Sequence, residues 1–182
     1  MQVEIQLKKY KMKISSLNQN EYHPYYDPYI QMVGETDLME ALRETNEVFQ
    51  HAIIDLPLDK LHYAYAEGKW TIAEIILHLI DAERVFQYRA LRFARNDQTD
   101  IPGFEQDDYV KTANAAKRSK KELLEEFKAV RSSSLTLFGS FSEDVLKRKG
   151  TANGNYMSVR ALGFVLSGHI LHHLKIIDER YL

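Results

Sequence analysis

Apolar residues recur every three or four positions in four segments of the chain, and this period limits the possible fold more than any other feature. The segments cover residues 36–54, 72–96, 117–139 and 157–179. Such spacing places the apolar side chains on one face of an α-helix. No convincing alternation of apolar and polar residues interrupts the segments, so no sheet is predicted. Four amphipathic helices of this length predict an all-α protein built as a four-helix bundle.

Local signals mark several ends of these helices. Thr71 followed by Glu74 is a capping-box pattern and places a helix start at residue 72. Trp70, directly before it, is expected to pack against the start of that helix. Pro57 ends the first predicted helix, and the pair at 153–154, Asn-Gly, predicts a turn before the last one.

The residues before the first helix have a different composition. Residues 17–35 contain two prolines and four tyrosines and show no helical period. We therefore expect an irregular aromatic strap whose rings pack across the helices. Residues 1–24 are expected to form a weakly ordered N-terminal extension before a bundle domain over residues 25–182. Met12 is a second candidate for the start of the protein, and the sequence leaves the choice between Met1 and Met12 open.

Composition and charge exclude several functional classes. The chain has 24 Lys and Arg against 26 Asp and Glu, a formal net charge of −2, so it has no overall attraction to nucleic acid or anionic lipid. No run of about 18 apolar residues predicts a membrane span, and the N-terminus lacks the apolar stretch of a secretory signal. We expect a cytoplasmic protein that acts on a small molecule. Cysteine is absent, which leaves nitrogen and oxygen atoms as possible metal ligands.

The last predicted helix carries three histidines within five residues: His169, His172 and His173. At about 100° per residue, His169 and His173 fall in the middle of the apolar stripe of that helix and His172 lies near its edge. Two imidazoles four residues apart on one inward face can bind a single cation. Without a cation, each would need a polar partner in an apolar interior. An ordinary pair of hydrogen-bonded core histidines is the alternative.

His78 is the expected third ligand, because it lies on the broad apolar side of the second helix, between Ile75 and Leu79. Three histidines leave coordination positions open for water or substrate, which is typical of catalytic sites. Zinc, nickel and ferrous iron all suit imidazole, so the sequence does not select one divalent metal. The remaining histidines, which we expect at the surface, are His23, His51 and His62.

Three stretches resemble the DinB/YfiT-like superfamily in its DinB_2 branch. They are "GKWTIAEIILHLIDAERVFQYRALRFARND" at 68–97, "IPGFEQDDYV" at 101–110 and "MSVRALGFVLSGHILHHLKIIDERYL" at 157–182. The resemblance covers about residues 25–182. It implies an up-down-down-up bundle, commonly a homodimer, with a divalent metal held by one histidine after the tryptophan and by an HxxxH pair in the last helix. Those positions are His78, His169 and His173 here, and His172 is their neighbour.

The resemblance also implies a choice of reactions. Activities in the superfamily include transfer of a low-molecular-weight thiol, such as bacillithiol, glutathione or mycothiol, to an electrophile. A metal-dependent S-transferase is our leading hypothesis, because a metal-coordinated thiol is deprotonated and nucleophilic. A metal-dependent hydrolase is the alternative and needs a general base, for which Asp81, Glu83 and Asp178 are available, although such acids are mostly exposed at surfaces. A stress-induced metal-binding protein without catalysis is the third reading.

Two further features of the sequence bear on the site. Four arginines of the second helix are expected to form surface and inter-helix ion pairs and not a nucleic-acid stripe, since acidic residues lie among them and their directions differ. These are Arg84, Arg89, Arg92 and Arg95. Arg89 lies near the angular direction of His78 and is a candidate substrate anchor. The loop at 97–109 is a candidate cover for the pocket.

Overall fold

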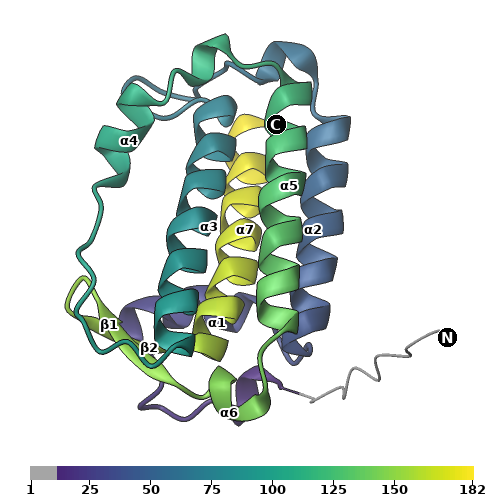
Figure 1. The fold of residues 1–182 in the computed structure, drawn as a ribbon. Coiled ribbons are helices and arrows are strands. Elements are labelled where there is room, and N and C mark those ends of the chain that lie inside the picture. Colours follow the sequence, from purple (N-terminus) through teal and green to yellow (C-terminus); the bar gives the residue numbers. More distant parts are fainter. Residues whose placement is uncertain (1–11) are drawn as a thin grey trace, which may run out of the picture.

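The computed structural model describes residues 12–182, which form a bundle of four long helices (Figure 1). The helices are α2 (Leu38–Asp55), α3 (Ile72–Ala94), α5 (Lys120–Gly139) and α7 (Val159–Tyr181). Each begins and ends within a few residues of a predicted segment, so the all-α prediction is confirmed. Among the described residues, no helix combines the length and the apolar composition needed to cross a bilayer.

The order of the helices around the bundle differs from their order in the chain. Helix α7 packs against α2 and α3, and α5 packs against the same two helices. Figure 1 shows α2 and α7 running in one direction and α3 and α5 in the other, which is the up-down-down-up arrangement. Because α3 and α5 are parallel, the chain must return along the bundle between them. Residues 95–119 make this return and carry the short helix α4 (Gln106–Thr112) beside α3.

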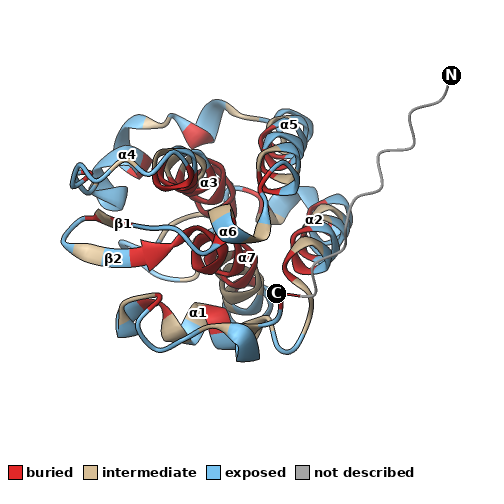
Figure 2. Ribbon diagram, turned by 60° about the horizontal axis from the view of Figure 1, so that its bottom comes forward, coloured by how far each residue is buried: buried red, intermediate tan, exposed pale blue. Residues whose placement is uncertain are grey.

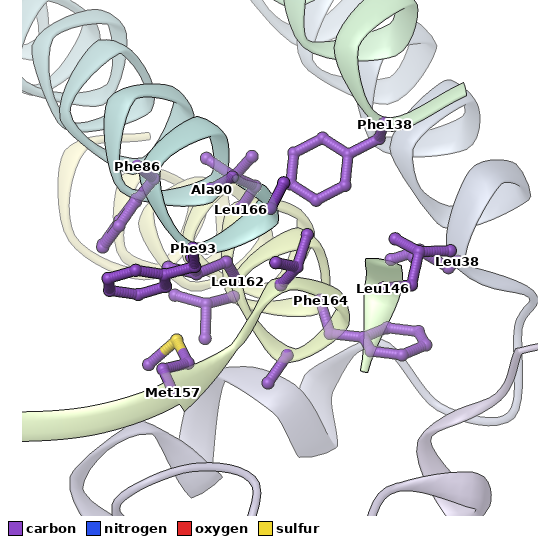
Figure 3. Close-up of a cluster of buried hydrophobic side chains, with 14 of the residues drawn as sticks. Leu38, Phe86, Ala90, Phe93, Phe138, Leu146, Met157, Leu162, Phe164 and Leu166 are labelled. Atoms are coloured by element: carbon purple, nitrogen blue, oxygen red, sulfur yellow. The ribbon is translucent and has the colours of Figure 1, made fainter. Parts of the chain in front are cut away.

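The core consists of two clusters of apolar side chains stacked along the bundle axis. The first, drawn in Figure 3, lies around the start of α7 and includes Phe93, Phe138 and Phe164. The second includes Phe49 and Phe127, whose ring centroids are 4.0 Å apart. Figure 2 shows the buried residues on the faces that the helices turn toward one another. Leu166 belongs to the first cluster and Ile170 to the second, so the histidines of α7 begin where the two clusters meet.

The predicted capping box at the start of α3 is confirmed. The hydroxyl of Thr71 accepts a hydrogen bond from the backbone N–H of Glu74 (3.2 Å), and the carboxylate of Glu74 accepts one from the backbone N–H of Thr71 (2.7 Å). Two N–H groups that the helix leaves without partners are thereby satisfied. Helix α5 begins with a second capping box, formed by Ser119 and Glu122.

Replacing Thr71 with alanine should lower the free energy of unfolding by about 1 kcal/mol, because one helix N–H group loses its acceptor. Urea unfolding followed by circular dichroism would measure the change. Thr136 lies exposed within α5 and serves as the control, since its replacement with alanine removes no cap. An identical midpoint for wild type and Thr71→Ala would contradict the prediction.

A short hairpin precedes α7 and was not expected. Strands β1 (Lys149–Ala152) and β2 (Asn155–Ser158) pair antiparallel, and Asn153 and Gly154 form the turn between them with φ of 53° and 71°. The observed turn confirms the prediction. Asn-Gly is suited to it because both residues readily adopt the positive φ angles of a type I′ turn. The prediction of no strand is wrong here, since four residues are too few to show an alternating pattern.

The aromatic strap is partly helical, so the expectation of irregular structure is wrong over α1 (Asp27–Met32). A 3₁₀ turn at Pro24–Tyr26 leads into it, and Pro24 and Pro28 lie in the first turns of these two elements. Proline is well suited to that position because its fixed φ matches the helix. Helix α1 packs directly on α7: a Cβ atom at Gly168 would lie 1.8 Å from the carbonyl oxygen of Tyr29. Only glycine permits this approach, which brings Tyr29 to the histidines.

The predicted extension, residues 1–24, is described from residue 12 onward, and residues 1–11 lie outside the described part. Met12 is buried, its N–H donates to the carboxylate of Asp37 (2.8 Å), and its carbonyl accepts from the N–H of Leu38 (2.8 Å). Glu21 is also buried and forms an ion pair with Arg160 of α7. Residues 12–24 therefore contact the bundle through both backbone and side-chain bonds.

Candidate metal centre

The three histidines selected from the sequence meet between α3 and α7. His78 lies in the second turn of α3, and His169 and His173 lie one turn apart on α7. The Nε2 atom of His169 is 3.2 Å from Nε2 of His78 and 3.1 Å from Nε2 of His173. One ring nitrogen from each of the three residues lies within 4.8 Å of the other two.

This arrangement fits a shared cation better than a hydrogen-bonded group of histidines. In a neutral imidazole, Nε2 either donates one hydrogen bond or accepts one. The Nε2 atom of His169 therefore satisfies only one of its two contacts. Nitrogen ligands at about 2.0–2.1 Å from a tetrahedral zinc ion are themselves separated by about 3.3–3.4 Å. The two observed separations lie close to that value, so the donor set fits a divalent metal.

The environment keeps these imidazoles neutral, as metal ligands must be. Burial lowers the pKa of His78 to about 4, although the negative charge of Asp107 opposes the shift. Burial also lowers the pKa of His173 to about 3, and neighbouring histidines add to the effect. The pKa of His169 is lowered well below its ordinary value by burial and by the same neighbours. At neutral pH the lone pairs of all three residues are free to bind a cation.

Aromatic side chains surround the histidines and restrict their rings. Trp70 packs on His78 with ring centroids 4.9 Å apart, so its predicted place at the start of the helix is confirmed. The ring of Tyr29 of α1 lies nearly perpendicular to the ring of His169, with centroids 5.5 Å apart, and to the ring of the half-buried His172, with centroids 5.2 Å apart. His172 is not one of the three converging residues. Of the other histidines, His51 and His62 are exposed and His23 is half-buried.

Two cavities reach the converging histidines. The larger, of about 380 Å³, is bounded by His78 and His169, by rings of the strap and by residues 104–107 of the return segment. The segment at 97–109, a predicted cover for the pocket, thus supplies part of the wall. The second cavity, of about 370 Å³, reaches His173 from the side of Trp70 and Tyr181. Asp107 lines both cavities and so lies beside the histidines from either direction.

The acids that the sequence offered as general bases lie elsewhere. Glu83 is buried in an ion pair with Arg131, so its interpretation as a solvated surface acid is wrong. Asp81 is half-buried 3.6 Å from Arg84, and Asp178 is exposed. In the described part of the chain, none of the three lines either cavity.

Sequence reasoning missed the acids that do line the larger cavity, Glu105 and Asp107. The available signal was their position in the loop already considered as a cover, where the sequence reads "FEQDDY". Glu105 is the N-cap of α4 and Asp107 lies in its first turn. A helix of seven residues is too short for an apolar period to give the direction of each side chain, so this signal selects the segment and not the residue.

The arginines of α3 separate into two groups. Arg84 is 2.8 Å from Glu126 of α5 and Arg92 pairs with Asp97, which confirms ion pairs for these two. Arg95 is exposed. Arg89 instead lines the larger cavity, where it is 4% exposed. Its predicted direction toward the mouth of the bundle is confirmed. The prediction of an ion pair is wrong for Arg89, which is buried and pairs with no carboxylate of the described residues.

Part of the chain is similar to a curated sequence. It is from Geobacillus thermodenitrificans (strain NG80-2), is named "Putative metal-dependent hydrolase", and is 32% identical over 75 residues. The match covers 41% of this chain and 42% of that protein, so it spans less than half of either.

Two solved structures are similar over much greater lengths. YfiT from Bacillus subtilis, described as a probable metal-dependent hydrolase with an unusual four-helix bundle topology, superposes with a TM-score of 0.67 at 16% identity, over 94% of this chain and 91% of its own. A mycothiol-dependent maleylpyruvate isomerase superposes with a TM-score of 0.64 at 13% identity, over 76% of this chain and 58% of its own. At these identities the two matches establish the fold.

The family assignment comes from a separate comparison. The family model described as the DinB superfamily matches residues 41–177, about three quarters of the 182 residues, and the matched part includes His78, His169 and His173. The chain belongs to the DinB superfamily.

Proposed function

We propose that the protein is a metal-dependent enzyme in which His78, His169 and His173 hold one divalent cation beside the larger cavity. The observation that carries the proposal is the convergence of the Nε2 atoms of three neutral imidazoles, two of which, His78 and His169, line that cavity. Three protein ligands leave a coordination position for water or substrate, whereas structural zinc sites are usually closed by four. Zinc, nickel and ferrous iron all suit three imidazoles.

Hydrolysis of a small molecule is the reaction that the lining residues support best. An ion of this kind, when bound, polarises a substrate oxygen and brings the pKa of water close to 7. Asp107 lines both cavities around the histidines, and its charge acts on His78. Its carboxylate is positioned to accept the proton of an attacking water and to return it to the leaving group. The names of the Geobacillus protein and of YfiT support the same reaction class.

Replacing Asp107 with asparagine should lower kcat by about 10²–10⁴-fold, because the amide cannot accept the proton. The metal content should not change, since Asp107 is not among the converging ligands. The adjacent Asp108 pairs with Lys111 on the exposed side of α4 and lines neither cavity, so Asp108→Asn is the matched control. Equal kcat for the two variants would remove Asp107 from the mechanism.

Thiol transfer is the second candidate function. The similarity of the fold to a mycothiol-dependent isomerase supports it. The chain contains no cysteine, so the thiol would arrive as a small co-substrate. A thiol that coordinates a metal loses its proton without a protein base. Thiol transfer should therefore survive Asp107→Asn, whereas hydrolysis should not.

One set of assays separates these functions. The metal-loaded protein is tested on small esters and amides without thiol, and then on an electrophile such as 1-chloro-2,4-dinitrobenzene with glutathione, bacillithiol or mycothiol. Turnover without thiol supports hydrolysis, and conjugation that requires thiol supports transfer. Retained metal with no turnover in either assay would contradict the enzymatic proposal and leave a metal-binding protein.

A further inference from the structure

Three arginines are buried in the described part of the chain, and they differ in their partners. Arg131 and Arg160 each pair with a buried carboxylate, from Glu83 and Glu21 respectively. Arg89 is as enclosed as Arg160, at 4% exposed, yet it forms no ion pair with any described residue. A buried charge without an opposite charge is costly, so this exception calls for a partner from outside the chain.

The contacts of Arg89 leave part of its guanidinium unsatisfied. Its Nε atom is buried and has no hydrogen-bond partner among the described residues. The hydroxyl of Tyr26 contacts the guanidinium, but a phenol carries no charge at neutral pH, and burial raises the pKa of Tyr26 further. The guanidinium carbon lies 5.5 Å from the centroid of the Phe86 ring, which supports it from one side.

Arg89 lines the same cavity as His78 and His169. Arg89 follows His78 by 11 residues on α3, about three turns, so the two side chains project in nearly the same direction. Phe86 also projects from α3 (Figure 3), and its ring centroid lies 6.3 Å from that of His169. The guanidinium is therefore no farther from His169 than these two distances combined, a span that a small molecule covers.

We propose that Arg89 binds the carboxylate of the substrate, while the reacting group of the same molecule lies at His78, His169 and His173. The position of the reacting group rests on the proposed function, whereas the binding of a carboxylate by Arg89 does not. A guanidinium presents two parallel N–H groups that match the two oxygens of a carboxylate, and this planar match fixes orientation as well as charge. Arg89 thereby holds one end of the molecule and determines which group reaches the metal.

The charges along the cavity favour a carboxylate over a phosphate. Glu105 and Asp107 line the same cavity and repel a second negative charge. One guanidinium balances a ligand with one negative charge and not a phosphate dianion. The rings of Phe86, Phe104 and Tyr29 supply an apolar wall for the body of the molecule. The predicted substrate class is a small monocarboxylate with an apolar or aromatic body.

Benzoate and benzamide test the carboxylate site, because they share size and ring and differ in charge. We expect wild type to bind benzoate at least about tenfold more tightly than benzamide in calorimetric titrations. Arg89→Met should lose this preference, and Arg89→Lys should keep only part of it, since lysine retains the charge without the fork. A carboxylate also binds metal directly, so both probes are measured on the His169→Ala/His173→Ala variant, where the preference should persist.

A second readout follows Arg89 itself. In protein labelled with nitrogen-15 arginine, benzoate should shift the Nε–H signal that Arg89→Met removes, and benzamide should leave it in place. Equal affinity of wild type for both probes, or an unchanged benzoate preference in Arg89→Met, would overturn the proposal. A larger shift with inorganic phosphate than with benzoate would overturn the carboxylate assignment.

The two proposals fail in different ways. Metal retained by wild type, with no response of Arg89 to benzoate, contradicts the anchor and leaves the proposed function standing. An Arg89 response in protein that retains no metal contradicts the proposed function and leaves the anchor standing. Stability gives a further check on folding: Arg89→Met should unfold at a urea concentration no lower than that of ligand-free wild type, because it removes a buried charge that has no carboxylate partner.

Discussion

The variant His169→Ala/His173→Ala is expected to lose its metal, from about one ion per chain in wild type to a background level, because a single remaining imidazole binds divalent cations weakly. Elemental analysis of protein purified without an affinity tag measures this directly. Any metal-dependent turnover should fall to background in the same variant. Wild type should also gain thermal stability when metal is added, since a ligand that binds only the folded state stabilises it, and the variant should not.

Two control variants separate the site from general effects of histidine loss. His51→Ala/His62→Ala removes the same number of imidazoles from exposed positions and should leave the metal content unchanged. His172→Ala removes the immediate neighbour of the site, which is not among the converging residues, and should also retain the ion. Equal metal in wild type and in His169→Ala/His173→Ala would show that the three histidines are not a metal centre.

Glu83→Leu is expected to lower the free energy of unfolding by about 3–5 kcal/mol, the usual cost of leaving one partner of a buried ion pair without its opposite charge. Arg131 is 0% exposed and Glu83 2% exposed. Nη2 of Arg131 donates to Glu83 (2.9 Å), and Nη1 donates to the carbonyl of Leu42 (3.1 Å) on α2. The hydroxyl of Ser134 on α5 donates to the same carboxylate (2.6 Å). The ion pair thus connects α2, α3 and α5, and its loss should lower the midpoint of urea unfolding.

The double variant Glu83→Leu/Arg131→Met tests whether the unpaired charge of Arg131 causes the loss of stability. Replacing both charges with apolar side chains removes the unpaired charge, so the double variant should be more stable than Glu83→Leu alone. Lys175 and Glu179 form an exposed pair on α7, and Lys175→Ala should cost less than about 1 kcal/mol. A cost for Glu83→Leu as small as that of Lys175→Ala would contradict the assigned role of the buried pair.

The converging histidines could be predicted because all three lie on regular helices. The 100° step per residue places His169 and His173 on the inward face of α7 and His78 on the inward face of α3. The angle per residue does not show that α3 and α7 pack against each other. That expectation came from the resemblance to the DinB superfamily. The same step indicated the direction of Arg89. It did not indicate that Arg89 lacks a carboxylate, because that depends on every residue packed around it.

The residues that sequence reasoning missed depend on contacts between distant parts of the chain. Asp107 reaches the histidines only because α3 and α5 are parallel and the return segment passes beside α3. Glu83 has the same local pattern as a surface acid, and it is buried because Arg131, 48 residues later, faces it. The hairpin at residues 149–158 has strands too short to produce a periodic signal.

Local periodicity and capping residues determined the four long helices and the inward faces that carry the three histidines, and the Asn-Gly pair determined the turn at 153–154. These features depend on interactions between residues that are close in the sequence, so local patterns predict them. The tertiary structure alone decided which acid lines the cavities at the histidines and which buried arginine has no carboxylate partner. Such features depend on side chains brought together from distant positions, and their burial and charge balance exist only once the bundle has packed.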